Sequence, residues 1–81
     1  MGASALEAWA SERNLSLEEH QLKTKPRARH WHLRHRRLAG TVELTSINDV
    51  WTIEVRKNRQ GPWITEELIA DLRELLSAEA E

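Results

Sequence analysis

The sequence predicts one small α+β domain over residues 1–81, in which an N-terminal and a C-terminal helix pack on one face of a three-stranded antiparallel sheet. Three observations predict this class. Apolar residues follow a helical period near both ends of the chain, and they alternate with polar residues between positions 27 and 56. The chain also has the length of one domain. We therefore expect the order helix, strand, strand, strand, helix (α-β-β-β-α), with the strands joined as a meander.

The first helix is expected over residues 5–13, because three apolar side chains share one helical face there: Leu6, Trp9 and Ala10. Ser4 and Glu7 have the spacing of a capping box at its start. Asn14 is expected to end the helix, since asparagine tolerates the left-handed conformation. A second capping box, at residues 16–19, favours a further helical turn that runs to about residue 23, and the alternative for residues 14–26 is a mobile arm.

Three strands are expected from the alternation of apolar and polar residues, and they begin at Arg27, Thr41 and Val50. Gly40 marks the first turn between them. Asn48 and Asp49 predict a two-residue hairpin turn, because both residue types accept positive φ.

This hairpin register pairs Glu43 directly with Glu54, on the sheet face opposite the helices. Like charges in direct cross-strand pairs are destabilising, so a compensating cation is expected. An even-numbered loop at Gly40 places either Arg34 or Arg36 opposite Glu43. We therefore expect one of these arginines to form a charge cluster with the two glutamates.

The last helix is the clearest element of the sequence. Thr65 is a favourable N-cap, and Glu66 and Glu67 follow where the helix dipole favours negative charge. Ile64 and Ile69 have the positions of a hydrophobic staple. Four leucines continue an apolar stripe at helical spacing, at positions 68, 72, 75 and 76.

The composition excludes several classes of protein. The chain has no cysteine, so neither disulfides nor thiolate metal sites stabilise it. It has no apolar run of the roughly 20 residues that a membrane helix needs, and its N-terminus lacks a secretory signal, so a cytoplasmic location without membrane contact is expected. No catalytic or cofactor motif is present, and we expect neither enzymatic activity nor a bound cofactor.

Basic residues are concentrated in the middle of the chain. Residues 23–59 contain ten Lys or Arg and three acidic residues, whereas both flanking segments are acidic. A basic stripe of this kind is typical of proteins that contact nucleic-acid phosphates. The residues expected to do so are Lys23, Lys25, Arg27, Arg29, His30, His32, Arg34, Arg36 and Arg56. The alternative is a module that forms a homodimer or binds an acidic protein partner, with no nucleic-acid role.

Two further interpretations of the sequence concern a metal site and a family resemblance. His30 and His32 point the same way on a strand, but every candidate third ligand (His20, Glu43 or Glu54) is distant in sequence, so no metal site is expected. The helix–three strands–helix order is also that of double-stranded RNA-binding domains. Those domains have a basic cluster at the start of the last helix, whereas Thr65 is followed by two glutamates here, so this family is not assigned.

Overall fold

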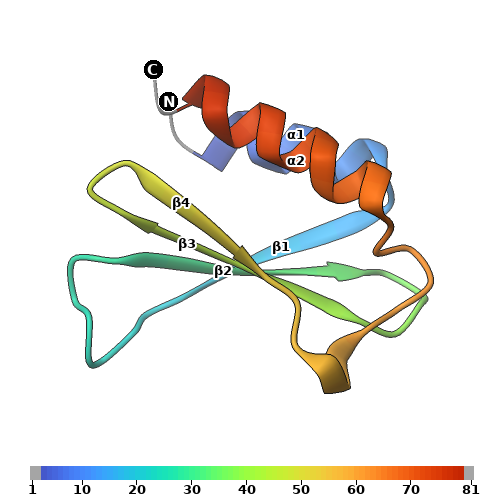
Figure 1. The fold of residues 1–81 in the computed structure, drawn as a ribbon, viewed down its shortest axis with the longest axis horizontal. Coiled ribbons are helices and arrows are strands. Elements are labelled where there is room, and N and C mark those ends of the chain that lie inside the picture. The colour runs from blue at the N-terminus through green and yellow to red at the C-terminus, as the bar shows by residue number, and fades with distance from the viewer. Residues whose placement is uncertain (1–2, 80–81) are drawn as a thin grey trace.

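The computed structural model describes residues 3–79, and the side chains of residues 5–78. The described chain is an α+β fold with a four-stranded antiparallel meander in the order β1-β2-β3-β4 (Figure 1). The expected fold class is confirmed, with one more strand than expected. The elements are α1 (Ala3–Glu12), β1 (Leu15–His20), β2 (Arg29–His35), β3 (Thr41–Ile47), β4 (Val50–Glu54), the 3₁₀ turn η1 (Lys57–Arg59) and α2 (Glu66–Glu79).

The fourth strand is β1, where the sequence predicts a helical turn. That expectation is wrong because pairing with β2 outweighs a local capping signal: β1 pairs along its whole length, from Leu15 opposite His35 to His20 opposite His30. Leu15 is also fully buried in the core. Asn14 ends α1 in the left-handed conformation, with φ of 60°, as expected. Its backbone oxygen accepts a hydrogen bond from the Arg36 amide at 3.2 Å, which ties the reversal to the sheet.

The β3–β4 hairpin has the expected register. Asn48 and Asp49 have φ of 51° and 64°, and Ile47 pairs with Val50 on either side of the turn. The same register places Glu43 opposite Glu54.

The loop between β2 and β3 is longer than expected. Leu33 pairs with Val42, and the paired residues nearest the loop are Arg34 and Thr41. Residue 43 therefore faces His32, and the expectation that it faces Arg34 or Arg36 is wrong. The wider turn is stabilised by the His35 imidazole, whose Nδ1 accepts hydrogen bonds from the amides of residues 37 and 38 at 3.0 and 3.1 Å.

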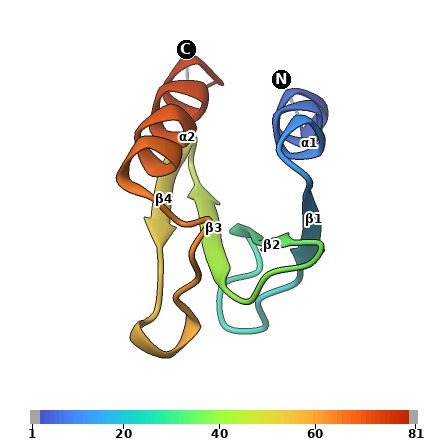
Figure 2. The same cartoon turned by 90° about the vertical axis from the view of Figure 1, so that its right-hand side faces the viewer.

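Both helices pack on the same face of the sheet, as expected (Figure 2). α1 contacts β1 and α2 contacts β4, which lie at opposite edges of the sheet. Trp31 and Trp51 stack between the layers, with ring centroids 5.0 Å apart. The core contains Leu6, Trp9, Ala10, Leu15, Trp31, Leu33, Val42, Leu44, Trp63, Leu72 and Leu76.

The starts of the two helices compare differently with those expected from the sequence. The Thr65 Oγ1 atom accepts a hydrogen bond from the Leu68 amide at 3.1 Å, which confirms the expected cap of α2. α1 begins at Ala3, two residues before its expected start, and the Ser4 side chain of the expected capping box lies outside the described side chains. No helix within residues 3–79 has the length and apolar character needed to cross a membrane.

Gly61 lies in the segment before α2 and packs closely against the β2–β3 loop. A Cβ atom at this position would lie 1.9 Å from the Ala39 backbone oxygen, which also accepts a hydrogen bond from Trp63 Nε1 at 2.9 Å. This close approach fixes the loop against the start of α2, and only glycine leaves room for it.

We expect Gly61→Ala to lower the free energy of unfolding by about 1–3 kcal/mol, because the added methyl group meets backbone that no side-chain rotation can clear. Urea unfolding followed by tryptophan fluorescence measures the change. Asn58→Ala, an exposed position in η1, is the control and should stay within about 0.5 kcal/mol of the wild type. Equal stabilities for the two variants would contradict the close approach.

Candidate functional site

The sheet face opposite the helices, called here the helix-free face, carries the polar residues of all four strands. Because Trp31 and Leu33 point into the core, their neighbours on β2 point the other way. The cross-strand register then assigns to this face Ser16, Glu18, His20, His30, His32, Arg34, Thr41, Glu43, Thr45, Thr52 and Glu54. The connections after β1 and β4 extend on the same side of the sheet (Figure 1).

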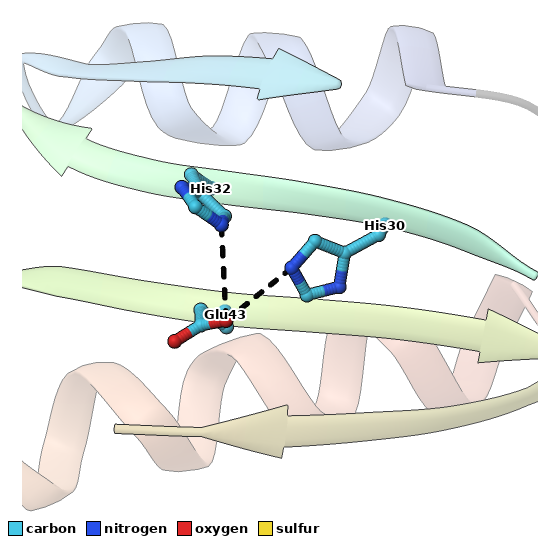
Figure 3. Close-up of side chains that lie close together, drawn as sticks. All are labelled: His30, His32 and Glu43. Atoms are coloured by element: carbon cyan, nitrogen blue, oxygen red, sulfur yellow. Dashed lines mark ion pairs between the residues drawn. The ribbon is translucent and has the colours of Figure 1, made fainter. Parts of the chain in front are cut away.

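Glu43 lies at the centre of the helix-free face and is only 7% exposed. Its Oε2 atom lies 2.7 Å from Arg56 Nε. Its Oε1 atom lies 3.3 Å from His30 Nε2 and 3.7 Å from His32 Nε2, and both rings point toward it from the neighbouring strand (Figure 3). A buried carboxylate needs such partners, because an uncompensated charge away from water costs several kcal/mol.

The expected charge cluster therefore exists around Glu43 but has different members. Its guanidinium comes from Arg56, beyond the end of β4, and neither Arg34 nor Arg36 contributes. The long β2–β3 loop moves both of those arginines away from Glu43 along the strand direction. Glu54 lies opposite Glu43 on β4 and is exposed, and no ion pair joins it to the described residues.

Three histidine rings adjoin one another on β1 and β2. The ring centroids of His20 and His32 are 4.1 Å apart, and those of His30 and His32 are 5.1 Å apart in an edge-on arrangement. Thr45 Oγ1 lies 2.8 Å from His30 Nδ1 and fixes the orientation of this buried ring. His20 Nε2 lies 2.8 Å from a Glu18 oxygen, but their geometry is not that of a hydrogen bond, and this buried nitrogen has no hydrogen-bond partner among the residues that the structure describes.

An open cavity of about 300 Å³ lies over these side chains. It is lined by His20, Gln21, Leu22, His30, His32, Glu43, Arg56 and Arg59. Residues 21 and 22 come from the β1–β2 connection, whereas Arg59 comes from η1, so the two connections form opposite walls of the cavity.

The nine residues expected to contact phosphates divide into two groups. Lys23, Lys25 and Arg27 are exposed on the β1–β2 connection, and Arg34 and Arg36 are exposed near the other end of β2, where Arg34 Nη2 lies 3.4 Å from His32 Nδ1. The remaining four have partners within the protein. His30, His32 and Arg56 surround Glu43, and Arg29 pairs with Glu19 at 3.1 and 3.2 Å and stacks on Trp31.

Sequence reasoning named His20 only as a distant candidate for a third metal ligand, and it missed Gln21, Leu22 and Arg59 as parts of the site. A signal existed for His20, because in an extended segment it has the same strand parity as Glu18 and points away from Leu17. This signal applies only if residues 15–20 form a strand, whereas the capping-box pattern favours a helical turn there. Arg59 carries no such signal, since it lies on the exposed turn η1, outside the alternation of the strands.

Comparison with known proteins adds no assignment. The chain matches no protein-family model, no curated protein and no solved structure. The chemistry of the site therefore rests on its own residues. Neutral imidazoles and a carboxylate can hold a metal ion or exchange protons, and exposed guanidinium and ammonium groups can bind phosphate.

We expect the imidazole of His32 to titrate below its ordinary pKa of 6.5. Burial lowers this pKa most, and His20, His30 and Arg34 lower it further, whereas Glu43 raises it. The unfolded chain therefore binds this proton more readily than the folded chain. Its contribution to stability is complete above pH 6.5 and is lost as the pH falls through the lowered pKa. An NMR titration of the ring protons tests this, and a midpoint above 6.5 would contradict it.

Proposed function

We propose that this chain is a small binding module that contacts nucleic-acid phosphates through the loops and rim of its helix-free face. The observation that carries the proposal is the sorting of charge between the two faces of the molecule. The strand residues of the helix-free face and the connections 21–28 and 55–60 contain seven Lys or Arg against three Glu: Lys23, Lys25, Arg27, Arg34, Arg56, Lys57 and Arg59 against Glu18, Glu43 and Glu54.

The helical layer has the opposite charge. Between residues 5 and 78 the two helices carry six acidic side chains and one basic one, Arg73. A polyanion is therefore repelled by one side of the molecule and attracted by the other. Such a field orients an approaching nucleic acid as well as increasing its rate of encounter.

The cations on the helix-free side are available for contact. Lys23, Lys25 and Arg27 are exposed, as are Arg34 and Arg59, and none of these five forms an ion pair with the residues that the structure describes. Exposed cations of this kind bind phosphate with little desolvation, and each contact releases counterions from the nucleic acid.

The chemistry of this surface favours backbone contacts over base recognition. The four tryptophans lie in the core or pack against it, so they are not free to stack on unpaired bases. Binding would therefore depend on phosphates, fall steeply with salt and select weakly among sequences. A duplex, whose phosphates form a regular charged surface, suits this face better than a single strand.

The alternative is that the same face binds an acidic protein surface or a second copy of the chain. Its support is Val50, which begins the edge strand β4 and is 66% exposed at the tip of the β3–β4 hairpin, opposite Ile47 of β3. Exposed apolar side chains next to an unpaired strand edge are a common contact point.

We expect the protein to bind generic duplex DNA or RNA at about 50 mM salt, and to lose about a hundredfold in affinity by about 200 mM, as about four phosphate contacts predict. The triple variant Lys23→Ala, Lys25→Ala, Arg27→Ala should bind more weakly and lower the salt slope by about 1 for each lost contact. Fluorescence anisotropy with a labelled duplex measures both effects.

A matched pair of single variants separates a local contact from general charge. Arg27→Ala and Arg73→Ala each remove one exposed arginine, but on opposite sides of the molecule. Only the first should weaken binding. Absence of binding at about 50 mM salt would refute the proposal, and a mass above the 9.4 kDa monomer by light scattering would then favour the alternative.

A further inference from the structure

The side chains of His30, His32 and Glu43 converge at the floor of the cavity on the helix-free face. Each offers one ligand atom, and the three atoms lie within 4.8 Å of one another. We propose that these three residues bind a divalent transition-metal ion such as Zn²⁺. This proposal does not depend on nucleic-acid binding, because it concerns the buried centre of the face and not its exposed rim.

Two of the three distances between the ligand atoms are close to those of a metal site. Zinc binds nitrogen and oxygen ligands at about 2.0–2.2 Å, so neighbouring ligand atoms of a tetrahedral site lie about 3.3–3.6 Å apart. The two nitrogen–oxygen distances to Glu43 Oε1 are 3.3 and 3.7 Å. Both exceed the roughly 2.7–2.9 Å of a charge-assisted hydrogen bond, so neither imidazole is drawn fully onto the carboxylate.

The backbone holds these residues in place before any ion binds. His32 lies directly opposite Glu43 in the β2–β3 ladder, and His30 follows two residues away on the same face. The contact of 2.8 Å between His30 Nδ1 and Thr45 Oγ1 directs Nε2 toward Glu43. Metal-binding histidines commonly have such a partner on their second nitrogen, which fixes ring orientation and tautomer.

The ligand set indicates the class of ion. Two imidazoles and one carboxylate suit zinc, copper, iron or nickel, whereas magnesium and calcium prefer sites made of oxygen alone. Three protein ligands leave further coordination positions, and the adjoining cavity of about 300 Å³ gives water or another ligand access to them. His20, whose Nε2 is buried without a hydrogen-bond partner, lines the same cavity.

Arg56 gives the proposal a sharp test. Its Nε lies 2.7 Å from Glu43 Oε2, which leaves Oε1 for the ion, but its positive charge opposes a second cation nearby. The Arg56 side chain is 57% exposed and can be replaced without opening the core. Arg56→Gln should therefore increase the affinity for Zn²⁺ several-fold. An unchanged affinity would place the ion away from Glu43 and overturn the site.

The main experiment is a calorimetric titration of the metal-stripped full chain with Zn²⁺, in the absence of nucleic acid. We expect one ion per chain, and a rise in Tm of about 10 °C when Zn²⁺ is at about a hundredfold above its Kd. His32→Asn and Glu43→Gln should each reduce the affinity at least tenfold.

His35→Asn is the matched control, since it removes an imidazole from the same strand and keeps an oxygen that can accept the loop amides. Loss of Zn²⁺ binding in this control, or its retention in His32→Asn, would overturn the assignment.

A second measurement uses the unaltered protein, so that the proposal stays testable if a variant fails to fold. Co²⁺ should give the intense visible absorption of a low-symmetry, four- or five-coordinate site, and Zn²⁺ should displace it. In NMR spectra, Zn²⁺ should shift the ring signals of His30 and His32 and leave those of His35 in place. A titration without saturable binding, or shifts confined to His35, would refute the site.

Discussion

The buried carboxylate of Glu43 organises the helix-free face. A charge at the centre of a sheet is tolerated only when cations or hydrogen-bond donors surround it, and here they come from three separate parts of the chain. His30 and His32 come from β2, and Arg56 comes from the connection after β4. The ion pair with Arg56 holds that connection against the helix-free face, where Arg59 lines the cavity. The cavity therefore lies over one buried glutamate, on a face where cations outnumber acidic residues.

The two oxygens of this carboxylate have different surroundings, and this difference shapes the chemistry of the face. Arg56 Nε lies 2.7 Å from Oε2, and the Arg56 side chain is largely exposed. The two imidazoles lie farther from Oε1, at 3.3 and 3.7 Å, and their side chains are mostly buried. The guanidinium provides permanent charge compensation, so the imidazoles need not be protonated to keep Glu43 buried. Imidazole binds metal ions in its neutral form. The exposed lysines lie outside this centre, so the phosphate contacts proposed for the rim would not compete with the imidazoles for Glu43.

Local signals in the sequence predicted the parts of the fold that depend on local geometry. The Thr65 cap and the Asn48–Asp49 turn are examples, since each needs only the backbone conformation of a few residues. β1 escaped prediction because the favourable partner of residues 15–20 lies on β2, beyond the reach of a capping pattern. The same limit applies to the site. Strand parity places His30, His32 and Glu43 on one face, but their distance from one another depends on the β2–β3 loop, whose length is stabilised by the His35 imidazole.

The centre and the rim of the helix-free face are coupled through charge. Without an ion, Arg56 compensates the charge of Glu43, so the centre beneath the cavity is close to neutral toward a phosphate that approaches Arg59. A divalent cation on Glu43 would make that centre positive while leaving the rim unchanged. Linkage makes such an effect reciprocal: a phosphate that binds the metal-bound face more tightly must also hold the metal more tightly. The metal site and the phosphate contacts proposed for the rim are therefore expected to strengthen each other.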